Sequence, residues 1–164
     1  MNSTHNFQVE MDHFKQLIGQ IADGHSSSVI SYFSLSEGMY NMREAMDTDE
    51  HHRASFDDLH HVSSFVRGNR EEIDHDQLIR RVRHKLREVF DFNLMFSGMK
   101  EKAEEIREEV ESQIETLCEM MTHAFAVVDH IEYMYYDEGG YDITRIDIKQ
   151  GKRYQIFQFI RFID

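Results

Sequence analysis

The sequence predicts a mainly α protein: an antiparallel helical bundle with a long helical hairpin at about 70–136 and a small C-terminal β-hairpin at 141–164. The 164 residues contain no proline, whereas average usage near 5% would give about eight, and proline breaks helix interiors. Apolar residues between Met99 and Tyr136 recur every three or four positions without an intervening glycine, which is helical periodicity. The length suits one domain over 1–164.

Three shorter helices are expected in the first part of the chain. The first covers about 7–22, where apolar residues follow helical steps before Asp23-Gly24. Serines at 26–28 offer N-caps for a second helix that extends to about Met46. A polar loop at 47–52 precedes a third helix, which begins at Ser55 and stops at Gly68.

A fourth helix follows, with Asn69-x-x-Glu72 as its predicted cap and Ser97-Gly98 as the break after it. If that break is a tight turn, a basic cluster at 80–87 lies beside the acidic start of the next helix. Opposite charges then fix the pairing of the two helices. Pairs at equal distances from the turn are Arg87 with Glu108, Arg83 with Ser112, and Arg80 with Glu115. A continuous helix through Gly98 is the alternative.

The segment Met99–Tyr136 is expected to be one amphipathic helix. At 1.5 Å per residue it would span about 57 Å, a length that suits a hairpin, a bundle or a shared coiled coil. Its apolar stripe consists of Met99, Ala103, Ile106, Val110, Ile114, Leu117, Met121, Ala124, Val128, Ile131 and Tyr135.

Residues 141–164 differ in composition from the helical part of the chain. β-Branched and aromatic residues flank a turn at Gly151, which indicates a β-hairpin. Tyr154, Phe157 and Ile160 also fit a helical step, so a short buried helix is the alternative.

The chain is strongly acidic, with 31 acidic and 18 basic side chains and a formal net charge of −13. Phosphate backbones attract cations, so direct binding of nucleic acid is not expected. The acids concentrate on the long helix, where they suit a basic or nucleic-acid-binding protein partner. One form of this role is a decoy whose carboxylates imitate phosphates. The residues concerned are Glu101, Glu104, Glu105, Glu108, Glu109, Glu111 and Glu115.

Side chains that often mediate protein–protein contacts are abundant, with 10 methionines, 12 phenylalanines and 7 tyrosines. Methionine and tyrosine are common at binding surfaces. Tyr133, Tyr135 and Tyr136 would cover several sides of the last helical turn, so they are candidate partner-binding residues. A homodimer is the expected oligomeric state.

Eleven histidines provide a competing metal hypothesis. A carboxylate and an imidazole three residues apart share one helix face, as in di-iron bundles. Glu10-x-x-His13 and Glu72-x-x-His75 match that spacing. Iron or zinc would be the cofactor of such an enzyme or sensor; otherwise no cofactor is expected. Another candidate zinc set is Glu119, His123 and His130.

No nucleophile or phosphate-binding motif such as GxSxG or GxxxxGK[ST] is present. The lone Cys118 excludes an internal disulfide. No signal peptide or apolar run of membrane-spanning length is found, so a cytoplasmic location without membrane contact is expected. The sequence favours a non-enzymatic protein that binds and regulates or inhibits a partner protein, with the metal-dependent helical bundle as the alternative.

Overall fold

The computed structural model describes residues 3–21, 28–47, 70–96, 99–137 and 141–162. Contacts divide the chain into two compact units, which are described separately. The helical unit comprises Met1–Val29 and Asp74–Val127, and the sheet unit comprises Ile30–Ile73 and Val128–Asp164. The expectation of one domain over the whole chain stays a prediction.

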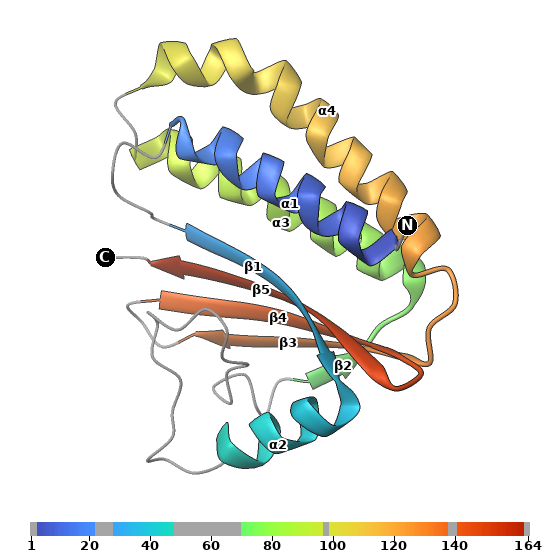
Figure 1. The fold of residues 1–164 in the computed structure, drawn as a ribbon. Helices are drawn as coiled ribbons and strands as arrows, with labels where there is room; N and C mark the ends of the chain where they lie inside the picture. The colour runs from blue at the N-terminus through green and yellow to red at the C-terminus, as the bar shows by residue number, and fades with distance from the viewer. Residues whose placement is uncertain (1–2, 22–27, 48–69, 97–98, 138–140, 163–164) are drawn as a thin grey trace. The chain divides into compact units, whose positions relative to one another are not determined.

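The helical unit contains α1 (Ser3–Gly19), α3 (His75–Phe96) and α4 (Lys100–Ala124). Helix α4 contacts both α1 and α3 (Figure 1). Each helix buries the apolar stripe that its sequence predicts, because helical spacing places those residues on one face. The core includes Phe7, Met11, Phe14, Leu78, Val82, Leu86, Ile106, Val110, Ile114 and Leu117.

Helix α3 begins at a capping box that differs from the predicted one. The Asp74 carboxylate accepts a hydrogen bond from the Gln77 backbone N–H at 2.8 Å, and the Gln77 side-chain oxygen accepts from the Asp74 N–H at 3.0 Å. These reciprocal bonds satisfy donors that the first helical turn leaves free. The predicted cap at Asn69 lies outside the described residues, and Glu72 belongs to a strand.

Helices α3 and α4 form an antiparallel pair in which the expected charges meet. Arg83 binds Glu115 at 3.0 Å and Arg87 binds Glu111 at 3.2 Å. The register differs from the prediction by about one helical turn, since Arg83 was expected opposite Ser112. The predicted turn at Ser97-Gly98 lies outside the described residues.

The prediction of one helix from Met99 to Tyr136 is wrong. Helix α4 ends at Ala124, and strand β3 (His130–Asp137) follows after a short connection. The Phe125 N–H still bonds to the Met121 carbonyl at 3.0 Å, but Ala126 bonds to His123 at 3.4 Å, so the last turn tightens. Val128 and Ile131 continue the helical spacing of the apolar residues, although neither residue is helical. Over so short a stretch, apolar spacing does not distinguish a helix from a strand.

The sheet unit corrects the predicted fold class. Within the described ranges, five strands form one sheet in the order β1-β5-β4-β3-β2 (Figure 1). They are β1 (Ser28–Ser36), β2 (Arg70–Glu72), β3, β4 (Tyr141–Gln150) and β5 (Arg153–Phe162). The protein is therefore α+β. The predicted helical bundle with a small C-terminal hairpin, and with it the coiled coil, is wrong, because β4 and β5 are interior strands of the sheet.

Strands β4 and β5 pair in antiparallel register from Tyr141↔Phe162 to Gln150↔Arg153. The turn places Gly151 at φ 61°, a left-handed conformation that glycine adopts without a side-chain clash. Its N–H donates to a carboxylate oxygen of Asp129 at 2.6 Å, which ties the turn to the start of β3.

The second predicted helix is also wrong, because its first part is β1 and only α2 (Glu37–Asp47) is helical. The Ser36 hydroxyl accepts from the Met39 N–H at 3.2 Å and so caps α2. Tyr40 of α2 stacks on Tyr154 of β5 with ring centroids 3.6 Å apart. The predicted loop at 47–52, apart from Asp47, and the predicted third helix from Ser55 to its stop at Gly68 lie outside the described residues.

Candidate functional site

Helix α4 packs against both α1 and α3, so its surface divides into a buried side, two flanks and an outward side. The side toward the core buries Ile106, Val110 and Leu117. At 100° per residue, the direction opposite this buried side is occupied by positions four, three, four and seven residues apart. We call this set the outward stripe; it consists of Glu101, Glu105, Glu108, Ser112 and Glu119, all exposed.

The flank of α4 toward α3 is neutralised by arginines. Glu115 accepts two hydrogen bonds from Arg83, at 3.0 and 3.2 Å, and Arg87 contacts both Glu111 and Glu115. The hydrogen bond to Glu115 raises the pKa of Arg83. Exposed pairs of this kind contribute about 0–1 kcal/mol each, so they set the helix register more than they stabilise the fold.

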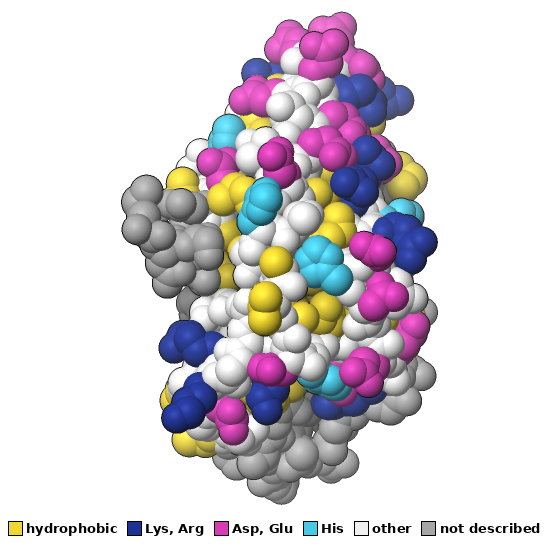
Figure 2. Space-filling model, turned by 90° about the vertical axis from the view of Figure 1, so that its right-hand side faces the viewer, with side chains coloured by type: hydrophobic (Ala, Val, Ile, Leu, Met, Phe, Trp, Pro, Cys, Tyr) yellow, Lys and Arg dark blue, Asp and Glu magenta, His cyan; other side chains and the backbone are white. Residues whose placement is uncertain are grey.

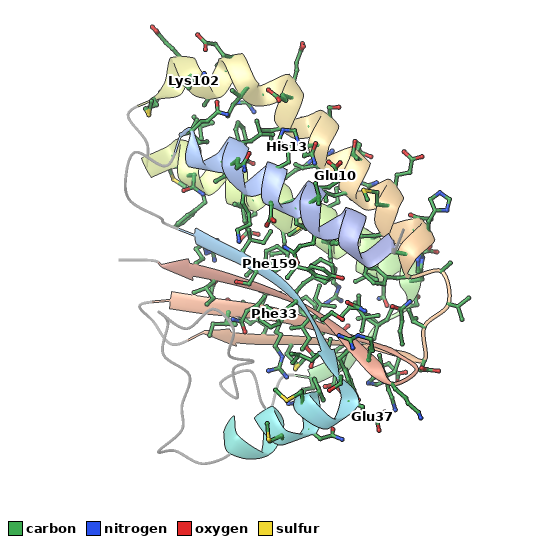
Figure 3. All side chains as sticks on the ribbon, in the orientation of Figure 1. Glu10, His13, Phe33, Glu37, Lys102 and Phe159 are labelled. Carbon is green, nitrogen blue, oxygen red and sulfur yellow. The ribbon has the colours of Figure 1, made fainter. Side chains whose placement is uncertain are left out.

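On the side of α4 toward α1, two predicted metal ligands that belong to α1, Glu10 and His13, contact side chains of α4. The Gln113 amide donates to the Glu10 carboxylate at 2.6 Å and to the Glu10 backbone carbonyl at 3.0 Å. His13 lies 3.8 Å from Glu109. Figure 3 shows Glu10 and His13 on α1 beside α4. By accepting both hydrogen bonds from the Gln113 side-chain amide, Glu10 links α1 to α4.

Near the start of α4 the charged side chains are exposed, and their ion pairs form within the helix itself. Lys102 lies 3.7 Å from Glu105, and Arg107 contacts Glu104 at 2.8 Å. The hydrogen bond from Arg107 lowers the pKa of the Glu104 carboxyl, which therefore stays ionised at neutral pH. Glu101 and Glu108 have no ion-pair partner among the described residues. Figure 2 shows acidic side chains gathered at the end of the helical unit where α4 begins in Figure 1.

Exposed methionines flank this acidic end. Met95, in the last turn of α3, is 66% exposed, and Met99, just before α4, is 39% exposed. Methionine adapts its shape to different partners, so it is common on binding surfaces. The start of α4 thus combines carboxylates with flexible apolar contacts.

Of the other predicted metal ligands, Glu72 and His130 lie 3.4 Å apart in the sheet unit, although the sequence had assigned them to different sets. Glu72 belongs to β2 in the sheet unit, whereas His75 is the first residue of α3 in the helical unit. In the alternative zinc set, Glu119 and His123 lie on α4 of the helical unit and His130 begins β3 of the sheet unit. In the described ranges no three His, Cys, Asp or Glu side chains are placed to hold a metal ion.

The tyrosines proposed to bind a partner lie on a strand and not on a helical turn. Tyr133 and Tyr135 alternate with the buried Met134 on β3 and are themselves partly buried. The side chain of Tyr136 is outside the described set. Partner binding by these residues and homodimer formation stay predictions.

Cys118 is buried in the helical unit, on the side of α4 toward Arg83. Burial raises the pKa of its thiol, so the group stays protonated and weakly nucleophilic at neutral pH. This environment does not suit a catalytic nucleophile.

A buried polar network in the sheet unit was missed by the sequence reasoning. Arg145 Nε lies 3.0 Å from Asp147 Oδ1, with the two side chains 0% and 1% exposed. The Tyr40 hydroxyl donates to Asp147 Oδ2 at 2.6 Å and so joins α2 to the sheet. The signal was present, because residues two apart on a strand share one face.

No protein-family model, curated protein or solved structure matches this chain. No described helix is long and apolar enough to cross a membrane.

Proposed function

We propose that this protein is a non-enzymatic, cytoplasmic binding protein that docks a basic partner protein along the outward stripe of α4 and thereby regulates or inhibits it. The observation that carries the proposal is the position of Glu101, Glu105 and Glu108, which point away from the core on two successive helical turns. Helices α1 and α3 pack beside α4, so the stripe is the part of its surface that faces away from both. The flank glutamates are also exposed, but they contact basic or histidine side chains.

The ion pairs favour a short docking stripe over an extended imitation of a nucleic acid. Five of the seven glutamates first considered as phosphate mimics contact a basic or histidine side chain; these are Glu104, Glu105, Glu109, Glu111 and Glu115. Such contacts lower the net negative potential of the α4 flanks. Glu101, Glu105 and Glu108 rise only about 10 Å along the helix, whereas a DNA strand places a phosphate about every 3.4 Å of its axis over many steps.

The adjacent methionines add an apolar component to this surface. Met95 and Met99 border the acidic end of α4, so a partner helix with basic and apolar side chains would contact both kinds of group. Carboxylates on the rim mainly accelerate association and select against acidic proteins, while apolar contacts contribute to the lifetime of the complex.

The test compares two charge-matched triple variants in recovering the partner from extracts of the native cell. The stripe variant carries Glu101→Gln, Glu105→Gln and Glu108→Gln, and the control carries Asp12→Asn, Asp76→Asn and Asp91→Asn at exposed positions off the stripe. Three exposed ion pairs at up to about 1 kcal/mol each predict between a few-fold and about 100-fold weaker binding for the stripe variant.

The control variant should recover the partner like the wild type, and rising salt should release the partner from both. Circular dichroism verifies that all three proteins keep the same fold. Equal recovery by the stripe variant and the wild type would refute the proposal.

A further inference from the structure

In the part of the chain that the structure describes, the two edge strands of the sheet differ in length and charge. Strand β2, at one edge, has three residues, Arg70, Glu71 and Glu72, which are all charged and exposed. Short, charged edge strands resist pairing with another chain. Strand β1, at the other edge, has nine residues and contains neither a charged side chain nor a proline. The β1 edge therefore lacks the protection that β2 has.

Strand β1 can accept another strand on the side away from β5, because it ends the described sheet (Figure 1). An edge strand presents backbone N–H and C=O groups on its outer side, and these pair with an added extended segment. Apolar side chains border the same edge. Phe33 and Leu35 are half-buried and pack against Tyr40 and Ile156. A strand added beside β1 would thus form backbone hydrogen bonds and cover apolar surface.

Electrostatics permit a second copy of this chain at the β1 edge. With a net charge of −13, two copies repel each other wherever their acidic surfaces approach. Pairing β1 with itself places no like charges opposite each other, since the strand carries no charge. A cation lies against the strand, because Arg153 of β5 donates to the Ser34 hydroxyl at 3.0 Å. This cation offsets part of the repulsion between the two acidic chains.

The residue order of β1 suits pairing with its own copy. An antiparallel pair that uses the whole strand has Tyr32 on its two-fold axis, because this residue is the midpoint of Ser28–Ser36. Ile30 then lies opposite Ser34 of the second copy, and Ser31 lies opposite Phe33. Each of these pairs places a large side chain beside a small one, which avoids crowding across the seam. The two-fold axis also keeps each sheet face on the same side in both copies.

We infer that two copies of this chain pair antiparallel through β1, so that their sheets join into one. At 3.4 Å per residue, nine paired residues form a seam about 30 Å long and about 10 Å thick, which buries roughly 600 Å² over the two copies. Interfaces of standard size bury about 1,200–2,000 Å², so the dimer is reversible and depends on concentration. This interface does not depend on the binding function of α4.

The experiment follows self-association of the full chain by sedimentation velocity at protein concentrations from about 1 μM to about 1 mM. The apparent mass should rise from 19.6 kDa toward twice that value as the concentration increases. Hydrogen exchange at the two extremes of concentration then locates the contact. Protection of the β1 amides should increase about 3- to 10-fold at the higher concentration, whereas protection of the β2 amides should not change.

Two variants with the same change in charge make the assignment specific. Ser34→Lys places a charge opposite Ile30 of the second copy, so the dissociation constant should rise about 10-fold or more. Thr116→Lys adds the same charge at an exposed position of α4 and should leave association unchanged. Circular dichroism verifies the fold of both variants, and the hydrogen-exchange measurement on the wild type needs no substitution.

Three results would overturn pairing through β1. The first is a wild-type chain that stays monomeric over the whole concentration range. The second is a dimer whose β1 amides gain no protection, or one that Ser34→Lys does not weaken. The third is a monomer whose β1 amides become protected only when a different protein is added, which would assign this edge to that protein instead of a second copy.

Discussion

Replacing Arg145 with methionine should destabilise the sheet unit strongly. Arg145→Met keeps much of the side-chain volume but leaves the Asp147 carboxylate, 1% exposed, without its ion-pair partner. Removing one member of a buried pair costs about 3–5 kcal/mol, because the remaining charge stays desolvated. Tyr40 would still donate to Asp147 at 2.6 Å, which places the expected cost toward the lower end of that range.

The assay is urea unfolding followed by circular dichroism, with thermal unfolding as a second readout. A loss of about 3 kcal/mol is a large part of the 5–15 kcal/mol typical of a folded protein. It corresponds to a fall in Tm of about 6–12 °C for a chain of this size. Arg153→Met is the matched control, since Arg153 is an exposed arginine whose Nε donates to the Ser34 hydroxyl at 3.0 Å.

The double variant Arg145→Met, Asp147→Leu separates a buried charge from lost packing. Replacing both partners by apolar residues of similar volume is often neutral or stabilising, so the double variant should regain most of the lost stability. The reasoning is refuted if Arg145→Met lies within about 1 kcal/mol of Arg153→Met, or if the double variant is less stable than Arg145→Met alone.

Three further outcomes are expected. Gly151→Ala should lower the free energy of unfolding by about 1–2 kcal/mol in urea titrations, because alanine must adopt φ 61°; an unchanged midpoint would exclude strain at this turn. Glu115→Gln should cost no more than about 1 kcal/mol, since Glu115 and Arg87 are exposed and Arg83 is half-buried, and a loss above 2 kcal/mol would contradict a register-setting role. Alkylation of Cys118 should be slow in the folded protein, because burial raises the pKa of its thiol. The stability that this thiol contributes is fully present below its unfolded pKa of about 8.5 and is lost as pH rises through the raised folded value; rapid labelling at pH 7 would oppose this.

The sequence predicted the helical unit well because burial on a helix follows a single period. Phe7, Met11 and Phe14 of α1 are buried as their spacing indicates, and the predicted stripe of α4 is buried from Ala103 to Met121. The attraction between Arg83 or Arg87 and the α4 glutamates was also expected. The register of the α3–α4 pairing was not predicted correctly, because it depends on the length of the connection between the two helices.

The sheet was underestimated because its strands carry ambiguous patterns. In β3, Ile131 and Tyr135 continue the helical steps of α4, while Ile131, Tyr133 and Tyr135 also alternate as a strand does. Strand β1 has several serines that resemble helix caps, and only pairing with β5 makes it extended. Propensity alone does not reveal such long-range pairing.

The candidate site was partly visible in the sequence. The glutamates of α4 stood out by composition, but their division into paired flanks and an outward stripe depends on which helices pack beside α4. The proximity of Glu72 and His130 was hidden because they lie on two strands about sixty residues apart. Local spacing had instead grouped Glu72 with His75.

The most direct test of the binding proposal is photo-crosslinking in the native cell from position Ser112, at the centre of the outward stripe. The account predicts one dominant crosslinked partner from Ser112, and loss of that product when Glu101, Glu105 and Glu108 are replaced by glutamine. A photoreactive residue at Arg80, an exposed position on α3, should not give the same product. A crosslink of equal yield from Arg80, or one from Ser112 that survives the triple replacement, would contradict docking on this stripe.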